Sequence, residues 1–236
     1  MNNYKSTDFY FGISESKINI CFFDKEKYKL KNTVNFDIPG SLDNNLNFKI
    51  ISTLLKDSIR KLEKDLGLFL NSGNISIQSK TYQSILFSVK EIFDDKELNK
   101  EVIVKIVRSV IQQFHNSEKN LTILHVIINK YVVDDKIYNF LPEYKKIKKI
   151  ILEIELICLN KNLVNKLKNL FNECKIDLKK IVSYDYAKKF LKNIKDETLC
   201  LSAYEILNGA NQSEVIFNEK SLEKHTLFNK IFNFFD

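Results

Sequence analysis

The order of apolar segments along the chain constrains its fold more than any other feature of the sequence. The first segments are short, rich in Phe, Ile and Val, and separated by turn residues, which predicts β-strands. Apolar residues then recur at helical spacing from Ile50 to Leu66, and Gly67 is a suitable end for that helix. A further short strand is predicted at Asn74–Gln78, so the chain begins β-β-β-α-β. The three predicted opening strands are Phe9–Ile13, Lys17–Phe23 and Tyr28–Ile38.

The middle of the chain alternates strand and helix patterns and predicts a compact α+β unit. Asn160 is a suitable N-cap for the second of its helices, and Asp134-Asp135 is a turn between two strands. The last third is predicted to be helical, at about Tyr184–Lys192 and Leu199–Leu207, followed by a polar linker. The predicted elements of the middle are Thr81–Lys90 (strand), Asp95–Phe114 (helix), Leu121–Ile128 (strand), Lys130–Val133 (a strand that continues it), Ile147–Leu159 (strand), Lys161–Asn172 (helix) and Ile176–Val182 (strand).

Composition excludes several classes of protein. The chain has 236 residues, of which 44% are hydrophobic, so it can bury a core and is not disordered. Its net charge of +7 comes from lysine, because Arg60 and Arg108 are the only arginines. Nucleic-acid readers favour arginine, whose planar fork pairs bidentately with guanine and phosphate. We therefore expect no nucleic-acid partner, although a steep salt dependence of binding would revive that reading.

No motif for catalysis, cofactor binding or metal binding is evident. The chain contains no P-loop, GxSxG, HExxH, GxGxxG or CxxC pattern, and its four cysteines are far apart. His125 lies in an apolar strand and is expected to be structural, while Glu153 and Glu155 fit a solvated strand face. With only 5 glycines, the chain has few residues for phosphate-binding loops. The expectation is a non-enzymatic protein without cofactor or metal.

The C-terminal segment Leu222–Asp236 carries a continuous apolar stripe if it is helical, with Asn229, Lys230 and Asn233 on the other side. Two interpretations stay open: the helix docks on the core, or it lies in a membrane interface as a reversible anchor that self-association strengthens. No uninterrupted run of about 18 apolar residues predicts a spanning helix, and Met1–Asp8 does not resemble a secretory signal. The predicted membrane-binding residues are Leu227, Phe228, Ile231, Phe232 and Phe235.

The middle of the chain resembles FtsA, the actin-like cell-division protein of bacteria. Residues 121–134 (LTILHVIINKYVVD) resemble the family segment ILHV-x-P-x-x-Y-x-V-D without its proline. Residues 156–167 resemble the strand-loop-helix HLITCHNDMAKNIVKAV, and residues 174–182 resemble the strand CGLKVDQLIF. Phe11–Ile18 is similar to the first actin-like hairpin, GLDIGTSKV, and the Phe-rich end is similar to the family's membrane-targeting helix. The similarity is best over about Tyr82–Leu191.

The sequence departs from the family where the nucleotide binds. The first phosphate hairpin of the family needs an Asp and a Gly-Thr, whereas Gly12, Ser14 and Glu15 stand here. A carboxylate at Glu15 would repel phosphates. The second phosphate motif, DIGGGTTD, has no counterpart, and too few residues separate Leu191 from Ala203 for a second lobe. We therefore expect neither nucleotide binding nor hydrolysis. A residual actin-like ATPase is the enzymatic alternative.

The resemblance implies half of an actin-like (ribonuclease H-like) α/β fold with an inserted α+β subdomain and a C-terminal amphipathic helix. It implies an adaptor on the cytoplasmic face of the cell membrane, which recruits divisome partners through the inserted subdomain. FtsZ remains open as a partner, because its contact maps largely to the missing lobe. A PilM-like scaffold of a pilus or secretion platform is the alternative. The predicted divisions are 1–80 with 179–208 (first lobe), 81–178 (inserted subdomain), 209–221 (linker) and 222–236 (amphipathic helix).

Overall fold

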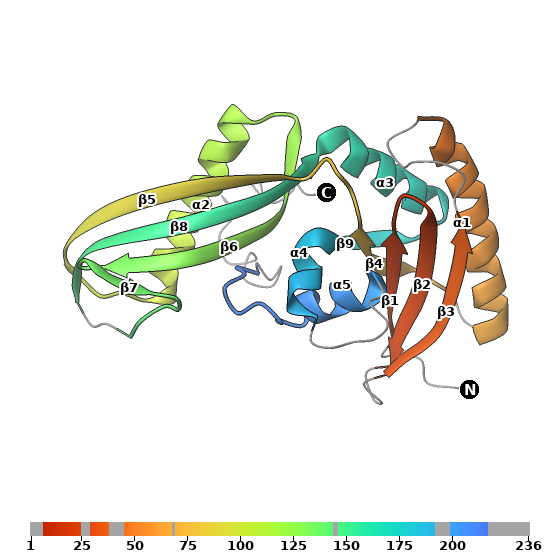
Figure 1. The fold of residues 1–236 in the computed structure, drawn as a ribbon, viewed down its shortest axis with the longest axis horizontal. Coiled ribbons are helices and arrows are strands. Elements are labelled where there is room, and N and C mark those ends of the chain that lie inside the picture. Colours follow the sequence, from red (N-terminus) through yellow and green to blue (C-terminus); the bar gives the residue numbers. More distant parts are fainter. Residues whose placement is uncertain are drawn as a thin grey trace.

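The molecule is elongated, with a body built on one β-sheet and an arm built on another (Figure 1). The structure is a computed structural model, and it describes residues 7–24, 29–37, 45–67, 69–143, 146–191 and 199–216. The predicted C-terminal helix, with Leu227, Phe228, Ile231, Phe232 and Phe235, lies outside the described residues. No helix among the described residues is both long and apolar enough to cross a membrane.

The body contains a five-stranded mixed sheet in the order β3-β2-β1-β4-β9. Strand β2 is antiparallel to β1 and β3, while β1, β4 and β9 run parallel. The strand order and directions are those of a ribonuclease H-like lobe, the fold class that the sequence resemblance implies. The strands are β1 (Thr7–Ile13), β2 (Lys17–Asp24), β3 (Lys29–Asp37), β4 (Ser72–Ile77) and β9 (Asp177–Ser183).

Helices cover both faces of the body sheet because its strands carry apolar side chains on both sides. Phe9, Phe11 and Ile13 face a core formed with α1 (Asn45–Leu66) and α3 (Lys161–Glu173). Their neighbour Tyr10 faces the opposite side, where it packs with the short C-terminal helices. These are α4 (Tyr184–Ala187), the 3₁₀ turn η1 (Lys188–Phe190) and α5 (Leu199–Leu207).

Helix α3 belongs to the body core, although the predicted inserted subdomain extends to residue 178. The ring of Phe171 meets Phe11 of β1 edge-on, with their centroids 4.8 Å apart. Leu163, Val164, Leu167 and Phe171 bury the apolar stripe of α3 against the body sheet. The sequence pattern identified the stripe correctly, but the pattern alone does not say which of two sheets the stripe covers.

The arm is a long antiparallel sheet with one helix on one face. Its sheet has the order β5-β8-β6-β7, and its buried side chains pack against α2 (Lys100–Ser117). The strands are β5 (Gln83–Lys96), β6 (Leu121–Val133), β7 (Lys136–Tyr138) and β8 (Ile147–Asn160). They carry the chain away from the body, so the far end of the arm lies at the left of Figure 1.

Helix α2 begins five residues later than the sequence pattern predicts. Strand β5 continues to Lys96, and Asp95 within it has a positive φ of 46°. The side chain of Asn99 then accepts a hydrogen bond from the backbone N–H of Val102, which caps α2. The cap and the continuing strand pairing therefore set the helix start, whereas the apolar periodicity extends beyond it.

Candidate protein-docking site

The face of the arm sheet opposite α2, called the open face, carries charged side chains that contact residues on neighbouring strands. Glu155 accepts hydrogen bonds from the Ser84 hydroxyl at 2.6 Å and from the Asn129 amide at 3.1 Å. On the next rung, the ammonium of Lys130 lies 3.0 Å from Glu153. These contacts confirm the expectation that the two glutamates lie on a solvated strand face. Each is held by cross-strand neighbours.

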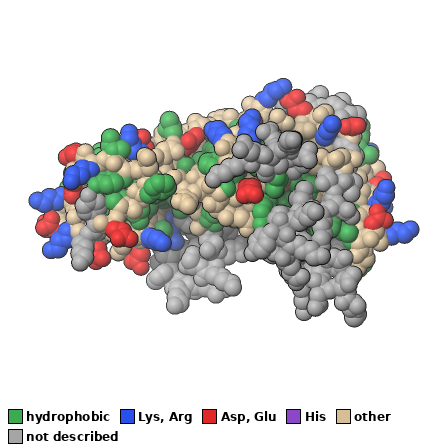
Figure 2. All heavy atoms as spheres, turned by 60° about the horizontal axis from the view of Figure 1, so that its bottom comes forward, with side chains coloured by type: hydrophobic (Ala, Val, Ile, Leu, Met, Phe, Trp, Pro, Cys, Tyr) green, Lys and Arg blue, Asp and Glu red, His purple; other side chains and the backbone are tan. Residues whose placement is uncertain are grey.

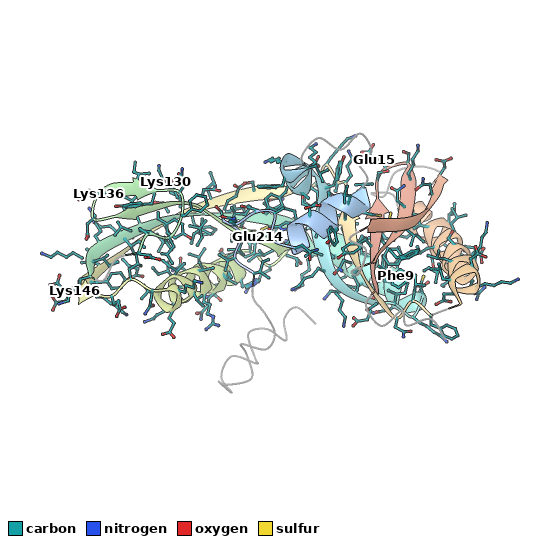
Figure 3. All side chains as sticks on the ribbon, turned by 90° about the horizontal axis from the view of Figure 1, so that it is seen from below. Phe9, Glu15, Lys130, Lys136, Lys146 and Glu214 are labelled. Carbon is teal, nitrogen blue, oxygen red and sulfur yellow. The ribbon has the colours of Figure 1, made fainter. Side chains whose placement is uncertain are left out.

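The tip of the arm is a tight turn. Asp134 and Asp135 both have positive φ, 44° and 67°, as the central residues of a two-residue hairpin loop require. The Asp134 carboxylate accepts from the backbone N–H groups of Lys148 and Lys149, and Asp135 pairs with the Lys149 side chain. The two aspartates are therefore turn residues, as predicted. Lys136 and Lys146 also lie at this end of the arm (Figure 3).

The base of the arm is tied to the body through a buried polar network around His125, which is 3% exposed. Its Nε2 atom accepts the backbone N–H of Ser183 at 2.9 Å, so the ring proton is on Nδ1. The Nδ1–H group donates to Glu214 at 2.7 Å. The hydroxyl of Tyr186 donates to the other oxygen of Glu214, also at 2.7 Å, and accepts from Asn211. His125 is thus structural, and it joins arm, body and C-terminal segment.

Residues 213–215 extend the arm sheet. The N–H of Ile128 donates to the Ser213 carbonyl at 2.9 Å, and the N–H of Val215 donates to the Val126 carbonyl at 2.8 Å. Ile127 and Glu214 form the bridge between these bonds. We call Asn211–Val215 the latch. The described part of the predicted linker, residues 209–216, is therefore attached along β6, because its backbone completes the free edge of that strand.

A groove of about 360 Å³ lies beside the latch, between α2 and the chain that follows β7. Its walls combine aliphatic and aromatic side chains with charged groups at two positions, Lys100 and Glu214. Phe140 is 61% exposed, and burial raises the pKa of Tyr131. The groove thus combines apolar side chains with polar ones. Its lining residues are Lys100, Ile103, Val104, Ile128, Tyr131, Asn139, Phe140, Leu141, Gln212, Ser213, Glu214 and Val215.

More apolar side chains reach solvent on the arm. Leu86 and Ile92 of β5 are 72% and 71% exposed, and Ile137 of β7 is 64% exposed. In Figure 2, hydrophobic side chains lie at the surface of the arm among charged ones. Leu86, Ile92 and Ile137 lie on β5 and β7, the two edge strands of the arm sheet. In the part of the chain that the structure describes, the arm thus combines a groove with exposed apolar side chains on its edge strands.

The hairpin at the predicted phosphate position is closed by its own hydrogen bonds. The N–H of Ser14 donates to the Lys17 carbonyl at 2.9 Å, and the N–H of Lys17 donates to the Ser14 hydroxyl. The carboxylate of Glu15 lies 2.8 Å from the Lys80 ammonium. Gly12 is covered by α5, since a Cβ atom there would lie 2.5 Å from Leu199 Cβ. The turn therefore carries the Glu15 carboxylate. Gly12 lacks a side chain and so allows α5 to pack closely against β1.

None of the four cysteines of the chain, Cys21, Cys158, Cys174 and Cys200, forms a disulfide. Burial raises the pKa of Cys158 to about 12 and that of Cys174 to about 11. Burial also raises the pKa of Cys200, which donates to the Tyr10 carbonyl. Thiols with raised pKa values are poor nucleophiles at neutral pH, in keeping with structural cysteines. Among the described residues, no group of three His, Cys, Asp or Glu side chains could hold a metal ion.

Comparison with known proteins finds fold neighbours but no sequence family. No protein-family model and no curated protein sequence matches the chain. The cytoplasmic domain of EpsL, an inner-membrane component of the Vibrio cholerae type II secretion system, matches with a TM-score of 0.38 and 10% identity. That match covers 80% of this chain and 61% of the solved EpsL domain.

Two further solved structures are similar to the chain. The PilM–PilN type IV pilus biogenesis complex matches with a TM-score of 0.47 and 9% identity, over 76% of this chain and 48% of the solved one. A Bacteroides thetaiotaomicron protein with an actin-like ATPase fold and unknown function matches with a TM-score of 0.36 and 12% identity, over 80% and 58%. The chain thus spans between 48% and 61% of the solved chains. The strand order of the body makes the fold class α/β, actin-like, with the arm as an inserted α+β unit.

Proposed function

We propose that this chain is a non-enzymatic scaffold on the cytoplasmic face of the cell membrane. Its arm binds a protein partner, and its C-terminal segment attaches it to the lipid surface. By its sequence resemblance to FtsA, the particular role would be that of an adaptor in cell division. The observation that carries the proposal is the latch: Ser213 and Val215 pair with β6 at the base of the arm.

The latch matters because it places Val215 on β6, beside the groove. Val215 lines the groove, so the following residues start at the docking site. Residues 222–236 carry the predicted membrane-binding stripe. A membrane-bound segment at this point would hold the arm beside the lipid surface. Partner binding and membrane attachment would then act at neighbouring places on the molecule.

The absence of ATPase activity is part of the proposal. Its support is the Glu15 carboxylate, which stands at the turn where actin-like proteins need phosphate-binding groups. Electrostatic repulsion from a carboxylate opposes phosphate binding. Titration of the purified chain with ATP and Mg²⁺, followed by calorimetry, should give no binding heat. Saturable binding in the micromolar range would restore the ATPase alternative.

Liposome flotation tests the membrane part directly. We expect the full chain to float with vesicles and the Phe228→Asp/Phe232→Asp variant to remain at the bottom, because two carboxylates in the stripe oppose burial in lipid. The Asn229→Asp/Asn233→Asp variant is the matched control, since it adds the same charge to the predicted polar side. Equal flotation of both variants would remove the anchor from the proposal.

Partner capture decides between the two roles that share this architecture. A cell-division adaptor should co-purify from cross-linked membranes with FtsZ or wall-synthesis proteins of the divisome. A scaffold of the PilM kind should instead co-purify with pilus or secretion components. Capture that persists unchanged when the groove residues Tyr131 and Phe140 are both replaced by Asp would contradict docking at the arm.

A further inference from the structure

The outer edge of β5 is unpaired in the part of the chain that the structure describes. The strand is 14 residues long and pairs with β8 on one side, and no described residue pairs with it on the other. Its residues Gln83–Lys96 are all exposed or partly buried. The unpaired N–H and C=O groups of such an edge readily add another strand. Natural edges are usually short, bulged or heavily charged, whereas most of this one is long and regular.

Protection of this edge is confined to its far end. The pairing with β8 is regular from Gln83 to Ile92, and the register shifts between Ile92 and Lys96. Asp95 has a positive φ there, and Asp94 adds charge. The preceding stretch has charged residues only at Lys90 and Glu91. A partner strand could therefore pair along the stretch up to Ile92 without meeting an irregularity.

The side chains of β5 complement themselves when the strand is placed antiparallel to a second copy about Val89. On the open face, Leu86 then lies opposite Ile92 of the second copy, at both ends of the ladder. These are the two strongly exposed aliphatic residues of the strand. On the α2 face, Val89 meets itself, and Phe87 lies opposite Glu91 within the regular stretch. Each apolar pair in this position is a stabilising cross-strand contact.

Neighbouring registers lose this complementarity. Side chains on one face recur at every second residue, so the alternative pairings centre on Ser88 or Lys90. A centre at Ser88 places the exposed Leu86 opposite Lys90. A centre at Lys90 places the two ammonium groups opposite each other, and like charges there are destabilising. The Val89 register puts Lys90 opposite Ser88. It therefore avoids both the Leu86–Lys90 contact and the Lys90–Lys90 contact.

We propose that two copies of this chain associate through β5, in an antiparallel pair centred on Val89. The two four-stranded arm sheets then form one continuous eight-stranded sheet. The contact is isologous, as in most two-fold dimers. It places a body at each end of the dimer and leaves the groove beside the latch at a distance from the contact. The inference does not depend on the proposed membrane or division role.

Sedimentation of the full-length chain tests the pairing. We expect a concentration-dependent dimer of twice the 27.7 kDa chain mass, and a monomer for the Leu86→Lys/Ile92→Lys variant. Both side chains are more than two-thirds exposed, so the variant should keep its thermal stability. The Ile137→Lys/Phe140→Lys variant is the matched control, because it removes two exposed apolar residues elsewhere on the arm and should remain dimeric.

A Phe228→Asp/Phe232→Asp background separates β5 pairing from association through the C-terminal segment. The dimer should persist in that background. A wild-type chain that stays monomeric at the highest concentration reached would overturn the proposal. So would a dimer that Leu86→Lys/Ile92→Lys leaves intact, or one that only the C-terminal substitutions dissolve.

Engineered disulfides test the register. In a Cys174→Ser background, the Ser88→Cys/Lys90→Cys variant should form a covalent dimer on mild oxidation, because residues 88 and 90 of different copies lie opposite each other. The Leu86→Cys/Lys90→Cys variant matches the register centred on Ser88 and should cross-link at least several-fold more slowly. Faster cross-linking of the second variant would contradict the Val89 register.

Discussion

The body and the arm bury their sheets in different ways. In the body, helices cover both faces, and β1 sends Phe11 to one core and Tyr10 to the other. In the arm, α2 covers one face, while the other carries the ion pair of Glu153 with Lys130. A sheet enclosed on both faces serves stability, whereas the arm sheet has an open face and, among the described residues, an unpaired outer edge at β5. This difference supports the proposal that the body provides stability and the arm binds a partner.

The largest expected effect is the loss of a ring from the body core. Phe11 is fully buried against Phe171, so Phe11→Ala should lower the free energy of unfolding by about 3–5 kcal/mol. The same truncation at the exposed Leu86 of the arm should change it by less than about 0.5 kcal/mol. Urea denaturation of both variants measures the contrast. Similar losses would mean that the two regions do not differ as described.

A smaller effect is expected where the two regions join. Glu214→Ala removes the carboxylate that accepts hydrogen bonds from both His125 and Tyr186. The buried imidazole N–H and phenol O–H groups then lose this hydrogen-bond acceptor. We expect a loss of about 1–3 kcal/mol and faster proteolysis at residues 208–216. Tyr186→Phe removes one donor and should cost less, about 1 kcal/mol. Unchanged protease resistance in Glu214→Ala would show that the latch does not depend on the network.

The Cys174 thiol of the body should react more slowly with alkylating reagents than an ordinary cysteine thiol does. Cys174 is half-buried with a pKa of about 11, so little thiolate is present at pH 8. Its alkylation by iodoacetamide should be more than tenfold slower than that of a free cysteine, whose pKa is about 8.5, and should accelerate up to about pH 11. A rate that levels off near pH 8.5 would contradict the burial of this thiol.

The smallest effect concerns the contact between α1 and α3. Hydrogen bonds and charge from Lys56, with a hydrogen bond from Ser52, lower the pKa of Glu173 in the folded chain. A carboxyl with a lowered folded pKa stabilises the fold above its unfolded pKa, and the contribution is lost as pH falls through the folded pKa. Glu173→Gln should therefore lose part of the acid-side pH dependence of stability. An unchanged profile between about pH 5 and pH 2 would exclude the linkage.

Much of the fold could be predicted from residue patterns, because local periodicity follows from which side chains must be buried. The stop at Gly67, with φ of 65°, and the cap at Asn160 are local effects of this kind. The body location of α3 and the latch could not be predicted, since both depend on which distant strand a segment meets. Glu214 lies in a polar stretch that resembles a linker, and only its buried contact with His125 reveals its role.

Site-specific photo-cross-linking tests the division between support and docking most directly. A photoreactive phenylalanine analogue at Phe140, 61% exposed beside the groove, compares with one at Phe69, 80% exposed on the body. In the cells that produce the chain, we expect position 140 to cross-link to a protein of a membrane-associated assembly and position 69 to give no such product. The same product from both positions, or from position 69 alone, would contradict docking at the arm.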